Sequence, residues 1–133
     1  MASNTTVVGI TTPLNLDFFK YWVDFLAPLH KLHGRNAEIT AFLLFRRFQL
    51  SQVIFDDEVL DAVLLSAEQK RLTREHFGIS LQNFQVVMIN LRKAKVIVNG
   101  KINKRFIPML TKEAEEYRLL IHFRIPEHED NEE

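Results

Sequence analysis

The chain has 133 residues, of which 47% are hydrophobic and 26% charged, with 17 basic residues, 17 acidic residues and no cysteine. This length and composition suit one folded domain and exclude a disordered chain, a disulfide scaffold and a cysteine zinc site. No apolar run approaches the roughly 20 residues of a membrane span, and residues 1–6 lack the basic and apolar stretches of a secretory signal, so we expect a cytoplasmic protein.

The N-terminal residues predict an extended segment followed by an aromatic helix. Thr5–Thr12 is rich in β-branched residues and stops at Pro13, so residues 1–14 are expected to form a strand or an arm. Asn15 is placed to cap a helix whose apolar residues recur at helical spacing until Pro28 interrupts it. Aromatic residues at helical spacing are commonly plain core, but this helix has more of them than a small domain easily buries, so we expect three to bind a partner: Phe18, Phe19 and Trp22.

Two further helices are expected before residue 65. Gly34 marks a break and Asn36 a possible cap, and an apolar pattern of helical period then runs through about Leu50. Asp56 and Asp57 stand where negative charge favours the start of a helix, which a short apolar stripe then extends.

The middle of the chain predicts two helices joined by a tight turn and followed by a hairpin. Ser66 with Gln69 resembles a capping box and starts a helix that ends at Gly78. Ser80 is placed to cap the next helix, which runs to residue 93. The dipeptide Asn99-Gly100 lies between two apolar stretches and predicts a two-stranded hairpin.

The C-terminal residues predict a strand and an acidic tail. Residues 117–125 alternate apolar and polar residues over their second half, so the region 111–125 is expected to contain a strand that could pair with residues 7–10. Residues 126–133 include five acids and are expected to be a solvated tail.

Positive charge is concentrated in one segment of this neutral chain. Residues 70–105 contain nine basic residues and one acidic residue, Glu75, a net charge of +8, and the rest of the chain is −8. Such a segment is the electrostatic footprint of a nucleic-acid-binding surface, although a solvated face is an ordinary alternative.

The stretch Leu72-Thr73-Arg74-Glu75-His76-Phe77-Gly78-Ile79-Ser80, continued by Leu91-Arg92-Lys93-Ala94-Lys95-Val96-Ile97 and the Asn99-Gly100 hairpin, resembles a winged helix-turn-helix domain. The resemblance covers about residues 36–107. It implies an α+β, mainly α fold, with residues 15–110 forming the winged-helix core and its preceding helix, and a peripheral pair of terminal strands. The layout also resembles small winged-helix proteins of tailed bacteriophages.

The resemblance implies that the helix after Ser80 enters the DNA major groove and that the hairpin contacts the backbone. The residues that it nominates for nucleic-acid binding are Gln82, Asn83, Gln85, Asn90, Arg92, Lys93, Lys101, Lys104 and Arg105. At Arg74 the family normally has a small residue between the two helices, so we expect either wider spacing or an outward-facing arginine.

Some residues favour a protein partner instead of DNA. Leu81, Val86 and Ile89 fall on the face that would read bases, where apolar side chains offer few hydrogen bonds, so these residues are also candidates for partner binding. His30 and His33 lie three residues apart without a third ligand, so no metal site is expected. No catalytic motif is present, and we expect neither an enzyme nor a cofactor.

Two functions therefore remain open. The first is a DNA-binding accessory or regulatory protein. The second is a structural protein that docks into a larger assembly such as a phage virion, as a homo-oligomer or in a hetero-complex, away from any membrane. Under either function one core is expected to contain Phe42, Phe45, Leu60, Leu64, Phe77, Ile79, Phe84, Val87 and Leu91.

Overall fold

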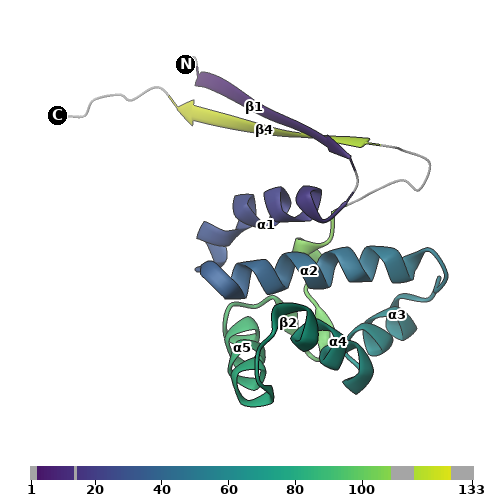
Figure 1. Cartoon of the computed structure of the whole chain (residues 1–133). Coiled ribbons are helices and arrows are strands. Elements are labelled where there is room, and N and C mark those ends of the chain that lie inside the picture. Colours follow the sequence, from purple (N-terminus) through teal and green to yellow (C-terminus); the bar gives the residue numbers. More distant parts are fainter. Residues whose placement is uncertain (1–2, 14, 109–115, 127–133) are drawn as a thin grey trace.

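The computed structural model describes residues 3–13, 15–108 and 116–126 (Figure 1). Its α-helices are α1 (Leu16–His30), α2 (Gly34–Ser51), α3 (Asp57–Leu64), α4 (Ala67–Phe77) and α5 (Leu81–Lys93). Its other elements are the strands β1 (Ser3–Pro13), β2 (Ile97–Val98), β3 (Lys101–Ile102) and β4 (Glu116–Pro126), and the short 3-10 helix η1 (Lys104–Phe106). The described chain is thus mainly α-helical with two small antiparallel sheets, as predicted for the fold class.

Helix α1 begins as predicted but ends later. The side chain of Asn15 accepts hydrogen bonds from two backbone N–H groups of the first turn. The predicted stop at Pro28 is wrong, because the helix continues to His30. A proline in the last turn removes one backbone hydrogen bond, which the packing of the rest of the helix outweighs. Lys31, in the left-handed region at φ 56°, ends the helix by donating its N–H to the carbonyl of Ala27.

The aromatic face of α1 is buried against α2. Phe18 and Phe19 are 3% and 1% exposed, and the ring centroid of Phe19 lies 5.9 Å from that of Phe45 and 6.0 Å from that of Phe48. The prediction that Phe18 and Phe19 bind a partner is therefore wrong. Phe19 is covered by Phe45 and Phe48 of α2, and the ring of Phe18 lies edge-on against that of Phe19.

Trp22 is half-buried and ties α1 to η1. Its indole N–H donates a hydrogen bond to the carbonyl of Phe106 at 2.7 Å, and Phe106 itself is completely buried. The ring centroid of His30 lies 4.5 Å from that of Phe106, and its Nδ1 donates to the carbonyl of Ala94 at 2.9 Å. Both Trp22 and His30 are thus engaged in contacts within the chain.

Helix α2 is central, since α1 packs on one side of it and α3, α4 and α5 also contact it (Figure 1). It starts directly after His33, and the prediction that Asn36 caps it is wrong. Asn36 lies in the first turn, where its carbonyl accepts a hydrogen bond from the hydroxyl of Thr40 at 2.8 Å. Nothing in the sequence indicates a helix start without a side-chain cap, which explains the error.

Helix α3 has the predicted start and a nearly buried ion pair to α2. The carboxylate of Asp56 accepts hydrogen bonds from the backbone N–H groups of Glu58 at 2.9 Å and Val59 at 3.1 Å. Arg47 Nε lies 2.9 Å from Asp61 Oδ1, and the two side chains are 12% and 9% exposed. This pair fixes α3 against α2.

The main core contains most of the predicted residues. Leu64, Phe84, Val87 and Leu91 are buried in one cluster, against which Phe45, Phe77 and Ile79 pack half-buried, and Leu60 is buried as well. Phe42 is not in this core, contrary to the prediction. It is half-buried, and its ring centroid lies 4.3 Å from that of His76 and 5.5 Å from that of Phe77, so it packs against the last turn of α4.

The terminal strands pair as predicted. β1 and β4 are antiparallel over eleven residues each, from Ser3 opposite Pro126 to Pro13 opposite Glu116. Figure 1 shows this ribbon on the α1 side of the molecule, with α4 and α5 on the other side of α2. Residues 111–115 of the predicted strand region and residues 127–133 of the predicted acidic tail lie outside the described residues. Among the described helices, none has the length and apolarity needed to cross a bilayer.

Candidate nucleic-acid interface

Helices α4 and α5 are joined by the predicted tight turn. Gly78 adopts a positive φ of 63°, which a residue without a Cβ tolerates best. The N–H of Ile79 bonds to the carbonyl of Arg74 at 3.2 Å and closes the end of α4. The hydroxyl of Ser80 accepts the N–H of Asn83 at 3.1 Å and starts α5. Both helix ends of the turn are therefore closed by local hydrogen bonds.

Helix α5 has a buried and an exposed face. The buried face is formed by Phe84, Val87, Met88 and Leu91, and none of them is more than 8% exposed. The exposed face carries most of the polar residues nominated for DNA: Gln82, Asn83, Gln85, Arg92 and Lys93, with Asn90 half-buried. It also carries Leu81, Val86 and Ile89, which are 57%, 54% and 46% exposed. The exposed face thus mixes amides, cations and aliphatic groups.

A groove of about 500 Å³ lies between α4 and α5. Leu81, Phe84 and Met88 contribute its apolar lining, and its cationic lining is Lys70, Arg71, Arg74 and Arg92. Thr73 is 2% exposed, whereas the neighbouring Arg74 is half-buried and lines the groove.

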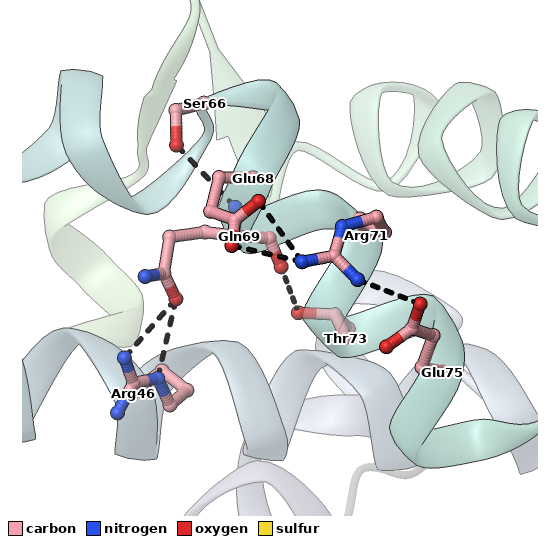
Figure 2. Close-up of polar contacts among 7 residues, drawn as sticks. All are labelled: Arg46, Ser66, Glu68, Gln69, Arg71, Thr73 and Glu75. Atoms are coloured by element: carbon pink, nitrogen blue, oxygen red, sulfur yellow. Dashed lines mark hydrogen bonds and ion pairs between the residues drawn. The ribbon is translucent and has the colours of Figure 1, made fainter.

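The cations that line this groove differ in whether they form an ion pair with an acidic residue. Arg71 bonds to Glu68 at 2.9 Å and to Glu75 at 2.8 Å, and these hydrogen bonds raise the pKa of its guanidinium (Figure 2). Lys70, Arg74 and Arg92 form no ion pair with any residue that the structure describes. Their positive charge is therefore available to an external anion.

Helix α4 is held to α2 by its first turn. The hydroxyl of Ser66 accepts the N–H of Gln69 at 3.4 Å, which is half of the predicted capping box. The Gln69 side chain does not return the bond, because its oxygen accepts two hydrogen bonds from Arg46 at 3.1 and 3.3 Å (Figure 2). Arg46 thereby fixes the helix that presents Lys70 and Arg74 to the groove.

The hairpin β2–β3 lies beside the end of α5. Asn99 and Gly100 have φ values of 54° and 74°, which is the mirror-image turn that the dipeptide predicts. A hollow of about 240 Å³ is lined in part by Arg92, Lys95, Asn99 and Gly100. Arg92 lines both the groove and this hollow. We call Lys70, Arg74, Arg92 and Lys95 the basic strip.

The nominated cations other than Arg92 line neither the groove between α4 and α5 nor the hollow at the hairpin. Lys101 Nζ is 3.5 Å from Glu58 Oε1 of α3, so its side chain turns toward α3. Lys104 and Arg105 are exposed on η1, which is anchored to α1 through Phe106. On α5 itself, Asn90 and Lys93 line a separate hollow that also includes residues of α1 and α2.

The cations that line the groove and the hollow without an ion pair thus differ from the set nominated from the sequence. Arg92 is common to both, and Lys70, Arg74 and Lys95 are added. Their membership of the basic segment and the i, i+4 spacing of Lys70 and Arg74 on one helix were the available signals. Among the described residues there is no group of three or more metal-binding side chains around His30 and His33 or elsewhere.

Comparisons of the chain with known protein families, with curated proteins and with solved structures found no match.

Proposed function

We propose that this is a DNA-binding accessory or regulatory protein whose α3, α4, α5 and hairpin β2–β3 act as a winged helix-turn-helix. The observation that carries the proposal is the basic strip, in which four cations without ion pairs to described residues follow the groove and the hairpin alongside α5. Cations beside a recognition helix neutralise DNA phosphates on both sides of the major groove that the helix enters.

The exposed face of α5 suits particular bases. Gln82, Asn83 and Gln85 project from its first half, and amide side chains pair with the N6 and N7 positions of adenine. Val86 and Ile89 follow on the same face, and aliphatic groups contact the thymine methyl group. The combination favours A·T base pairs, which gives the apolar residues of this face a role in DNA binding.

The test compares two triple variants with the same change in net charge. We expect Lys70→Glu/Arg74→Glu/Arg92→Glu to lose binding to a labelled duplex in fluorescence anisotropy. Lys101→Glu/Lys104→Glu/Arg105→Glu should retain measurable binding, because these residues line neither the groove nor the hollow. Equal losses would show a response to net charge alone, and the absence of wild-type binding at low salt would overturn the proposal.

A second candidate function, docking into a protein assembly, is supported by a different observation. Leu81, Val86 and Ile89 are large aliphatic residues about half exposed on one helix, and such a patch suits a protein partner. Val86→Ser/Ile89→Ser separates the two functions. If α5 reads bases, this variant should lower the preference for A·T-rich over G·C-rich duplexes. If α5 is a docking helix, the variant should abolish a protein complex and leave the affinity for DNA unchanged.

A further inference from the structure

Among the described strands, the ribbon formed by β1 and β4 has no hydrogen-bonded neighbour at either outer edge. The two strands form a sheet of their own, and no other described strand pairs with either outer edge. An isolated pair of strands is only marginally stable in water, and an open edge is a template for another strand. The ribbon can therefore accept a strand from outside the described chain.

The two edges differ in charge. β1 contains no charged residue, and seven of its eleven residues are β-branched: Thr5, Thr6, Val7, Val8, Ile10, Thr11 and Thr12. β4 contains Glu116, Arg118, His122 and Arg124. Charged residues are the usual protection of an edge strand against pairing with another chain. Only β4 has this protection, so β1 is the edge that is open to a partner.

We propose that β1 pairs in antiparallel fashion with β1 of a second copy, which gives a four-stranded sheet in the order β4–β1–β1–β4. A two-fold axis at Val8, the midpoint of the strand, sets Thr5 opposite Thr11 and Thr6 opposite Ile10 of the second copy. No like charges meet in this register. Pairing β4 with itself about its midpoint, Ile121, would instead oppose Arg118 and Arg124, which is destabilising.

The register within the ribbon supports the same arrangement. Val8 and Ile10 stand opposite Ile121 and Leu119, and directly opposed residues of an antiparallel pair belong to one face. Because the two-fold axis passes through Val8, each even-numbered residue of β1 stands opposite an even-numbered residue of β1 in the second copy. The uncharged, mainly apolar faces of the two ribbons therefore join on one side, and four strands with a common apolar face form a more stable unit than two.

Single cysteines test the pairing directly, because the chain has none of its own. In Val8→Cys the thiols of two copies lie on adjacent strands, about 5 Å apart by the spacing of sheets. In the control Ile121→Cys, the residue opposite Val8, they are three strand spacings apart, roughly 14 Å. A bismaleimide that spans the first distance but not the second should convert most of Val8→Cys, and little of Ile121→Cys, into a covalent dimer.

Single lysine substitutions on each strand test the pairing independently, by the molar mass of the protein in the absence of DNA. Val7→Lys puts a cation on the open edge strand and should shift the molar mass from dimer to monomer in light scattering. His122→Lys, its cross-strand neighbour on β4, should remain dimeric. Equal cross-linking of the two cysteine variants, or a wild-type protein that is monomeric at high micromolar concentration, would overturn the proposal. If Val7→Lys fails to fold, the cysteine comparison still decides.

Discussion

Replacing Trp22 tests whether α1 is a structural element or a partner-binding one. Trp22→Phe keeps an aromatic ring but removes the N–H that donates to the carbonyl of Phe106 at 2.7 Å. A neutral hydrogen bond of this kind contributes about 1 kcal/mol, so the free energy of unfolding should fall by that amount. For a chain of this size the expected decrease in Tm is about 3–5 °C. Trp22→Ala also removes the packing of a half-buried ring and should cost about 2–3 kcal/mol, below the range for a fully buried aromatic residue.

Urea unfolding followed by circular dichroism measures both variants, because Trp22 is the only tryptophan and its fluorescence is lost in each. The molar mass, measured in parallel, should be the same as for the wild type. A Trp22→Phe variant as stable as the wild type would refute the reasoning about the hydrogen bond. A Trp22→Ala variant that changes molar mass without changing the unfolding curve would show that Trp22 is an interface anchor after all.

Substitutions at three further places test other parts of the fold. Asp61→Ala removes the closer partner of Arg47 and leaves only Asp57 at 3.8 Å, so the free energy of unfolding in urea should fall by about 2 kcal/mol. Arg47→Met/Asp61→Leu should recover much of this loss, and an unchanged single variant would contradict the role of the pair. Ser80→Ala should cost about 1 kcal/mol in thermal unfolding and Ser80→Asp almost nothing, and equal stabilities would argue against the cap. Leu91→Ala should cost about 2–5 kcal/mol and Val86→Ala under about 0.5 kcal/mol, since only Leu91 is buried; similar losses would contradict the two faces of α5.

Local features of the fold could be predicted from the sequence because they depend on near neighbours. The caps at Asp56, Ser66 and Ser80 each join a side-chain oxygen to an N–H two or three residues ahead, so the residue type and its position suffice. The turn at Asn99-Gly100 is set by its own two φ angles. The pairing of β1 and β4 joins the two ends of the chain, and matching strand patterns were sufficient to predict it.

Features that depend on distant residues could not be predicted in the same way. Phe18 and Phe19 are predicted from the sequence to bind a partner, but the burial of Phe19 depends on Phe45 and Phe48 of α2, whose position the sequence does not give. Lys101 was nominated for DNA, but its partner Glu58 is 43 residues away on α3. The basic strip combines α4, the end of α5 and the hairpin, so only the folded arrangement distinguishes its members from the other cations of the basic segment.

The salt dependence of DNA binding is the most direct test of the basic strip. If its four cations each neutralise one phosphate, the logarithm of the association constant should fall against the logarithm of salt concentration with a slope of about −3.6. Arg92→Ala, which removes the residue shared by the groove and the hairpin, should make the slope shallower by about 1, and the matched variant Lys104→Ala should leave it unchanged. Equal slopes for Arg92→Ala and the wild type, or binding that does not respond to salt, would contradict the account.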